Sequence, residues 1–245
     1  MGRSFWGLAA AAVFAPGPAL ACGLELILAI DVSGSINARE YALQVGGMAD
    51  AFDNPSLHAA VGQLPGGMLV TITQWSGGSR QRHMTDWYTV SEPASLVQFA
   101  EVIRTTPRAW RNFSTAIGEA LIHAGEVSRA APHPCARRVI DVSGDGVSNE
   151  GRAPFPVAQR LADQGYTING LVIRGADPDP VSHYELEVIA GPGAFVEVAE
   201  GFEDYPRAIL RKLLREIDRP MFISEAEPDV TCDPPRRAEC PSPAR

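Results

Sequence analysis

The stretch that decides the fold is Leu-Glu-Leu-Ile-Leu-Ala-Ile (24–30), which runs directly into Asp-Val-Ser-Gly-Ser (31–35). A continuous apolar run of this length is typical of a strand that is buried on both faces of a parallel sheet. Residues 38–53 then carry apolar side chains at helical spacing, and Asn54-Pro55 is expected to end that helix. A buried strand followed by an amphipathic helix is the repeating unit of an α/β fold.

Strand and helix patterns alternate along the chain as far as residue 217. Strands are predicted at 68–75, 80–90, 137–143, 166–173 and 194–198, and helices at 92–105, 115–129, 154–164, 181–190 and 204–217. The strands at 68–75 and 80–90 are joined through Ser-Gly-Gly (76–78), which indicates a hairpin near a sheet edge. The pattern predicts an α/β, Rossmann-like domain with a mainly parallel sheet of about six strands and helices on both faces.

The composition fits a folded globular protein that binds neither nucleic acid nor an anionic membrane. Of the 245 residues, 45% are hydrophobic and 20% are charged. Without residues 1–21, which contain one arginine and no acid, the chain has 20 basic and 29 acidic residues and a net charge of -9. Such a charge disfavours polyanionic partners. No segment of the mature chain is long and apolar enough to form a transmembrane helix.

The first 21 residues have the pattern of a secretory signal peptide. Arg3 precedes a short apolar run at 5–14, and Ala-Leu-Ala (19–21) forms a small-residue cleavage site. We therefore expect a signal peptide at 1–21, the folded domain at 22–223 and a Pro-rich extended tail at 224–245, in a periplasmic or secreted protein. Cleavage would make Cys22 the first residue, which leaves lipid anchoring at Cys22 as an alternative.

Four cysteines, at positions 22, 135, 232 and 240, are expected to form disulfides in an exported chain. They permit three connectivities. They form no Cys-x-x-Cys pair and have no histidine at zinc spacing, so a metal role for them is not expected. The five histidines are interpreted as surface residues or as satisfied residues of the core.

Three polar clusters lie where strands end or helices begin, and they predict a metal site. They are residues 31–35, Ser-Gly-Asp-Gly (143–146) and Asn-Phe-Ser-Thr (112–115). In open parallel sheets, ligands bind at the carboxyl ends of the strands. Two carboxylates with several hydroxyls form an oxygen-only set, which hard cations such as Mg²⁺ prefer. The alternative for the first cluster is that Ser33 and Ser35 cap the following helix with help from Glu40.

Taken together, these segments resemble the von Willebrand factor type A (VWA) domains with their metal-ion-dependent adhesion site. Asp-Val-Ser-Gly-Ser (31–35) resembles the family's Asp-x-Ser-x-Ser signature, Thr-Ala-Ile-Gly-Glu-Ala-Leu (115–121) its second element and Asp-Gly (145–146) its third. The three elements occur in the family order, over about residues 24 to 218. The resemblance implies a divalent cation, Mg²⁺ with Mn²⁺ or Ca²⁺ as alternatives, held by Asp31, Ser33, Ser35, Thr115 and Asp145.

The resemblance also implies a function without catalysis. The free position on the cation would take an Asp or Glu side chain of a partner protein, so the chain is expected to be an adhesion-type binding module and not an enzyme. Ser114 stays an alternative to Thr115, because residues 112–114 replace the family's usual Gly-Gly. The signal peptide and the cysteines resemble an exported bacterial branch classed as a domain of unknown function. Since the first and fourth VWA strands are neighbours, a Cys22–Cys135 disulfide is implied, which leaves Cys232–Cys240.

Two other classes of function are kept as alternatives. A metal-dependent phosphatase-like hydrolase would use Asp31 as its nucleophile, although Ser33 stands where such enzymes carry a second acid. A structural envelope protein with an empty metal site is the other. Asp141, inside a predicted strand, is interpreted as a buried partner of Arg137 or Arg138. Trp110, Arg111 and Phe113 are expected either to face a partner or to pack beneath the 112–115 loop.

Overall fold

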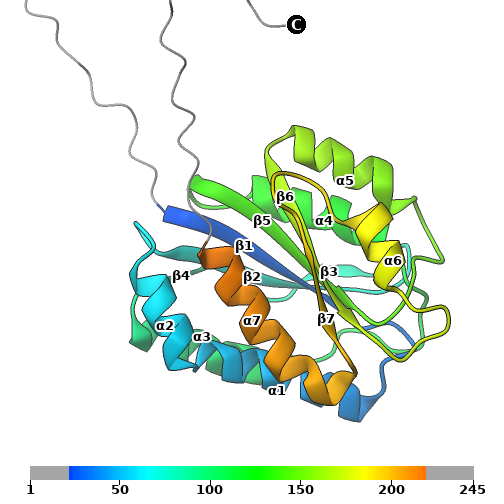
Figure 1. Ribbon diagram of the computed structural model, residues 1–245, viewed down its shortest axis with the longest axis horizontal. Helices are drawn as coiled ribbons and strands as arrows, with labels where there is room; N and C mark the ends of the chain where they lie inside the picture. Colours follow the sequence, from blue (N-terminus) through cyan, green and yellow to red (C-terminus); the bar gives the residue numbers. More distant parts are fainter. Residues whose placement is uncertain (1–21, 219–245) are drawn as a thin grey trace, which may run out of the picture.

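The structure is a computed structural model that describes residues 22–218; the predicted signal peptide, the predicted tail, Cys232 and Cys240 lie outside the described residues. Within the described range, seven strands form one sheet in the order β3-β2-β1-β5-β6-β7, with β4 also paired to β2 (Figure 1). The strands are β1 (Cys22–Asp31), β2 (Met68–Trp75), β3 (Gln81–His83), β4 (Tyr88–Val90), β5 (Cys135–Gly144), β6 (Tyr166–Ile173) and β7 (Val196–Ala199). Strands β1, β2, β5, β6 and β7 are parallel, and β3 and β4 run antiparallel to β2.

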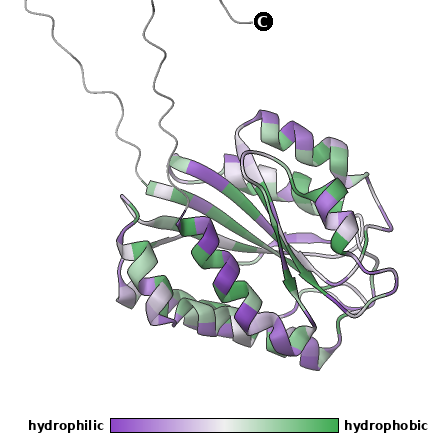
Figure 2. Cartoon of the chain, in the orientation of Figure 1, coloured by the Kyte–Doolittle hydropathy of each residue, from purple (hydrophilic) through white to green (hydrophobic). Residues whose placement is uncertain are grey.

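Helices cover both faces of this sheet (Figure 1). One face packs against α1 (Ala38–Phe52), α2 (Pro55–Gly62), α3 (Pro93–Thr105) and α7 (Tyr205–Ile217), and the other against α4 (Ile117–Arg129), α5 (Pro154–Asp163), α6 (Val181–His183) and the π-helix η1 (Tyr184–Val188). A 3₁₀-helix, η2 (Phe202–Asp204), leads into α7. Each face therefore has its own hydrophobic core, and the central strands are largely hydrophobic (Figure 2). In residues 22–218, no helix has the length and apolar character that crossing a membrane requires.

The predicted α/β class is confirmed, and β1 is buried along its whole length, as the opening run indicates. The sheet has seven strands where about six were expected, because the segment expected as one strand at 80–90 forms β3 and β4. Between β3 and β4, the Thr85 hydroxyl accepts the Ile72 N–H at 3.1 Å, so a side chain occupies the place of a backbone partner. The segment Asn54-Pro55 ends α1 and also begins α2, which the sequence analysis missed: the Asn54 side chain caps α2 and Pro55 occupies its first turn.

The predicted helix at 181–190 is shorter and irregular. Three α-helical residues are followed by a π-helix that ends at Val188, and Ile189 is already extended. Ala190 then forms a β-bridge with Ile168, so sheet pairing ends the helix early. The predicted strand at 194–198 begins two residues later, at Val196.

The Cys22–Cys135 disulfide is confirmed. The two residues are direct neighbours in the β1–β5 register, with Cα atoms 4.6 Å apart. They lie at the amino ends of both strands, opposite the polar loops. The Cys22 sulfur is bonded to Cys135, and the same sulfur cannot also carry a lipid.

Candidate metal centre

Two neighbouring parallel strands bring the first and third polar clusters to one edge of the sheet. Asp31 is the last residue of β1, and Asp145 directly follows β5. The register pairs Ile30 with Ser143, so the two strands end at the same level. Strand order and register alone therefore place the two aspartates side by side.

The two serines of the first cluster are not helix caps. The N-cap of α1 is Asn37, whose side chain accepts the Arg39 and Glu40 N–H groups, while the Glu40 carboxylate accepts the Asn37 N–H at 2.7 Å. This complete capping box excludes the alternative that Ser33 and Ser35 cap α1.

Hydrogen bonds connect four of the five predicted ligands. The Ser33 N–H donates to Asp31 Oδ1 at 2.7 Å, and the Ser33 and Ser35 hydroxyl oxygens lie 3.2 Å apart. The Ser35 hydroxyl donates to Asp145 Oδ1 at 2.7 Å. Asp31, Ser33 and Asp145 are buried, whereas Ser35 and Gly34 are exposed. The cluster therefore reaches solvent on the side of the loop between β1 and α1.

Thr115 and Ser114 both contact the segment that follows β5, but in different ways. The Thr115 backbone is fixed by Asn149, whose Oδ1 accepts its N–H at 2.9 Å and whose N–H donates to its carbonyl at 2.8 Å. The Thr115 hydroxyl lies 3.9 Å from the point that a Cβ on Gly146 would occupy. The Ser114 hydroxyl instead donates to the exposed Glu150 carboxylate. Of the two candidates, Thr115 is therefore the one that the fold turns toward Asp145.

Without a cation, the two negative charges of this cluster are unfavourable. Asp31 is fully buried, and its Oδ2 has no hydrogen-bond partner. Burial, and then the nearby Asp145 carboxylate, raise the pKa of Asp31 to about 8. Burial also raises the pKa of Asp145, against the opposing effect of the Ser35 hydrogen bond. A cation between these oxygens would satisfy the unpartnered atom and offset the cost of burying two negative charges, so the donor set fits a hard divalent ion.

Three residues that the sequence analysis missed also shape the cluster. Asn149 holds Thr115, and Arg108 donates to the Val32 and Ser33 carbonyls at 3.1 and 2.8 Å. The third is Tyr184, which is fully buried and whose hydroxyl has no hydrogen-bond partner. A Cβ on Gly144 would lie 2.6 Å from that hydroxyl and 2.9 Å from Asp31 Oδ2, so only glycine fits there and both oxygens face the same small space. None of these three residues belongs to a sequence motif from which its role could be predicted.

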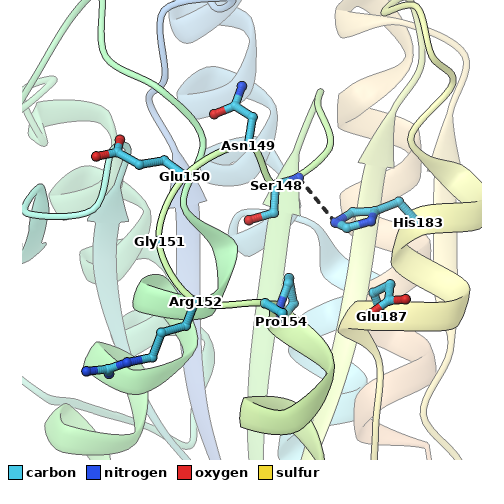
Figure 3. A pocket seen from close by; sticks show the side chains of 9 residues that line it. Ser148, Asn149, Glu150, Gly151, Arg152, Pro154, His183 and Glu187 are labelled. Carbon is cyan, nitrogen blue, oxygen red and sulfur yellow. Dashed lines mark hydrogen bonds between the residues drawn. The ribbon is translucent and has the colours of Figure 1, made fainter.

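A pocket of about 440 Å³ lies beside the Thr115 loop, between the segment after β5 and the α6–η1 segment (Figure 3). The Ser148 N–H donates to His183 Nε2 at 3.2 Å across it, and Ser148 Oγ accepts the Ile117 N–H at 3.2 Å. Burial lowers the pKa of His183. The serine hydroxyl thus faces the start of α4 while the imidazole bonds to the backbone, and the pocket contains no serine–histidine hydroxyl pair.

A second group of metal-ligand atoms lies at the opposite end of β1. His133 Nδ1 is 3.9 Å from Cys22 Sγ, and the ligand atoms of Cys22, His133 and Cys135 lie within 4.8 Å of one another. No metal role was expected for the cysteines, and the fold places His133 beside both of them. Both sulfurs are joined in the disulfide, however, and a metal-binding cysteine must be a thiolate.

Asp141 is buried as expected, but its partner is neither Arg137 nor Arg138. Its Oδ2 lies 2.6 Å from the Nζ of the fully buried Lys212, which also lies 2.6 Å from Glu216. Arg137 donates to the Glu216 and Ile217 carbonyls, and Arg138 donates to the Gln164 carbonyl. Helix α7 therefore supplies the cation that we expected from β5 itself.

Solved structures with the same fold include three proteins of low sequence identity. Proximal thread matrix protein 1 from the mussel byssus, described with a zinc-occupied MIDAS motif, has a TM-score of 0.58 and 16% identity over 81% of this chain and 47% of its own. A von Willebrand factor type A protein from Catenulispora acidiphila has a TM-score of 0.52 and 17% identity, over 80% of this chain and 42% of its own. The pilus adhesin SpaC from Lactobacillus rhamnosus GG has a TM-score of 0.57 and 14% identity, over 80% and 30%.

These likenesses show that the fold is that of a VWA domain, and at such identities they show the fold alone. The chain spans less than half the length of each of these three proteins. Among curated proteins, none matches the sequence. The sequence model of one family, described as "Protein of unknown function (DUF1194)", matches residues 21–221, and the chain therefore belongs to the DUF1194 family.

Proposed function

We propose that this protein is an exported binding module that uses a divalent cation to hold an acidic side chain of a partner protein. The observation that carries the proposal is the Asp31 carboxylate. It is fully buried, one of its oxygens has no hydrogen-bond partner, and its pKa is raised by burial and by Asp145. A buried acid in that condition is costly unless a cation or a proton neutralises it.

The chain offers a balanced set of oxygens for such a cation. Asp31 and Asp145 would supply two negative charges, and the hydroxyls of Ser33, Ser35 and Thr115 would supply neutral oxygens. Mg²⁺ suits this set, with Mn²⁺ or Ca²⁺ as alternatives. When bound, the cation supplies an electrostatic attraction for a carboxylate on the open side, where Ser35 and Gly34 are exposed.

Two of the structural neighbours support the proposal by what their descriptions say of them. The mussel protein is described with a metal in its MIDAS motif, and the Lactobacillus protein is described as a pilus adhesin. The disulfide is consistent with a protein that works outside the cytoplasm, where such bonds persist. The proposal includes no catalysis, since Ser33 replaces the second acid of aspartate-dependent phosphotransferases.

The proposal is tested by calorimetric titration of the oxidised protein with Mg²⁺, Mn²⁺ and Ca²⁺. Binding to one site is expected, with loss of binding in Asp31→Ala and no change in Asp163→Ala, an exposed acid at the end of α5. Thr115→Ala should weaken binding, while Ser114→Ala should leave it unchanged. Absence of binding, or binding that survives Asp31→Ala, would refute the metal site. Phosphatase turnover that is lost in Asp31→Asn would instead establish the hydrolase.

A further inference from the structure

We propose that the partner presents a cluster of acidic residues, in which one carboxylate binds the cation and its neighbours bind a basic rim beside the metal cluster. This inference rests on the proposed function. The basic rim comprises four arginines and two aromatic residues: Arg80, Arg82, Arg108, Arg111, Trp110 and Phe113. It joins the β3 edge of the sheet to the 107–114 segment.

The basic rim is hydrogen-bonded directly to the loop between β1 and α1, which carries Ser33 and Ser35. Arg108 donates to the Ser33 carbonyl at 2.8 Å, and the Gly34 N–H donates to the Phe113 carbonyl at 2.7 Å. A Cβ on Gly34 would lie 3.2 Å from that same carbonyl, so the two loops are in close contact. The adjacent Asn112 has a φ of 60°, a conformation that turns the chain sharply at this contact. A partner acid on the cation would therefore have the rim within reach of its neighbours.

The aromatic residues hold two of the arginines in place. The Arg80 guanidinium lies 4.5 Å from the centre of the Phe113 ring, and that of Arg82 lies 5.0 Å from the centre of the Trp110 ring. Phe113 is 41% exposed. Contact with a ring face uses none of the five N–H donors of a guanidinium. Arg80 gives only one amino group to Ser79, so most donors of both side chains stay available for carboxylates. That Trp110 and Phe113 face a partner stays a prediction; here their rings contact Arg82 and Arg80.

The four arginines of the rim have no ion pair with any acid of residues 22–218. Of the eleven other arginines in residues 22–218, seven pair with carboxylates, namely residues 39, 104, 129, 152, 174, 207 and 211. Glu150, which Arg80 influences electrostatically, already accepts hydrogen bonds from Ser114 and Gly78. A group of unpaired cations on a protein of net negative charge creates a local positive field beside the proposed site, and such a field favours an acidic partner.

Carboxylates of a protein are the polyanion that the observations favour. The cation already selects one carboxylate, and a rim of only four arginines provides a few contacts near that point. The net charge of -8 would oppose a long polymer that extends beyond the rim. A sulfated glycan is the competing class, and the experiment below separates the two.

The test uses the oxidised protein with saturating Mg²⁺ and two labelled peptides in a Gly-Ser background, one with a single central Glu and one with that Glu flanked by Asp residues. The rim variant carries Arg82→Gln and Arg111→Gln. Both residues are exposed, and in the described part of the chain neither side chain makes a hydrogen bond. The matched control carries Arg129→Gln and Arg160→Gln, which changes the charge equally at the ends of α4 and α5, near the amino ends of the strands and away from the metal cluster.

The wild type and the control should bind the Asp-flanked peptide more tightly than the single-Glu peptide, and the rim variant should lose about fivefold to tenfold of that gain. The gain should shrink as NaCl rises from about 0.05 M to about 0.5 M, because salt screens exposed charges. Mg²⁺ affinity, measured by calorimetry, should be equal in all three proteins. Failure of the wild type to bind Mg²⁺ refutes the proposed function itself. Normal Mg²⁺ binding with no gain from flanking acids, or rim-dependent binding of heparin that survives chelation, overturns the acidic-cluster partner alone.

Discussion

Replacement of Lys212 by methionine should destabilise the fold strongly, and more at pH 8 than at pH 5. Lys212 has no exposed surface, and its Nζ lies 2.6 Å from both Asp141 Oδ2 and Glu216 Oε1. Asn169 adds a hydrogen bond of 2.8 Å to the same Glu216 oxygen. The substitution keeps the length and apolar stem of the side chain but leaves two buried acids without their cation.

Loss of one partner from a buried ion pair costs about 3–5 kcal/mol. Since a domain of this kind is stable by about 5–15 kcal/mol, the variant should lose roughly a fifth of its stability or more. The cost depends on pH because protons can replace the lysine. Even beside Lys212, burial raises the pKa of Asp141 to about 7, with Glu216 adding to the effect.

The raised pKa sets the direction of the pH effect. An acid whose pKa is higher in the folded state than the unfolded value of 3.8 binds more protons when folded, so its contribution is favourable at low pH and is lost as pH rises through 7. Without Lys212, protonation is the remaining way to neutralise Asp141. The free energy of unfolding should therefore fall more steeply between pH 5 and pH 8 in the variant than in the wild type.

Urea unfolding followed by circular dichroism at pH 5 and pH 8 measures this prediction, with the disulfide kept oxidised. Arg160→Met serves as the control, since Arg160 is an exposed residue on α5. Lys212→Met combined with Asp141→Asn should recover part of the loss at pH 8, because one of the two uncompensated charges is removed. A loss below about 1 kcal/mol, or an equal loss at both pH values, would refute the reasoning.

Three further predictions concern the metal cluster and the disulfide. Tyr184→Phe should leave stability in EDTA unchanged or raise it by about 1 kcal/mol, since it removes a buried hydroxyl without a partner; a clear loss in thermal unfolding would reveal a partner that we have missed. Asp145→Asn should raise the free energy of unfolding in EDTA, because the Asp145 carboxylate contributes to the raised pKa of Asp31. The same variant should lose the stabilisation by Mg²⁺, which for the wild type is about 2.7 kcal/mol at a Mg²⁺ concentration of a hundred times Kd. A Mg²⁺ effect that persists in the variant would contradict this prediction. Cys22→Ser with Cys135→Ser should cost about 2–5 kcal/mol in urea, because the bond joins residues 113 apart; an unchanged midpoint would show that the sheet alone fixes these strand ends.

The sequence predicts the sheet and the placement of the aspartates because both depend on local patterns. The run at 24–30, apolar except for Glu25, favours a buried strand, and register then aligns Asp31 with the end of β5. Local patterns do not decide between Ser114 and Thr115 as the metal ligand. It depends on Glu150, which engages Ser114, and on Asn149, which holds Thr115, and both lie more than 30 residues further along the chain.

Contacts between residues far apart in the chain also explain the other differences between the predicted and the observed structure. The partner of Asp141 lies on α7, 71 residues away, and a sequence does not reveal that contact when Arg137 and Arg138 are close by in the chain. The division of the 80–90 strand depends on a hydrogen bond from Ile72 to the Thr85 side chain. In each case a tertiary contact overrides a local preference that is correct by itself.

Two pairs of acids in this fold show opposite solutions to the burial of charge, and the contrast supports the metal proposal. Asp141 and Glu216 lie beneath α7, and the chain provides Lys212, its only lysine, to neutralise them. Asp31 and Asp145 lie at the strand ends, and in residues 22–218 neither forms an ion pair with a basic side chain. Arg108 is close enough to influence Asp31, yet it donates its hydrogen bonds to backbone carbonyls. Where the acids are structural the fold supplies their cation; at the strand ends it leaves two carboxylates that a cation from solution would neutralise.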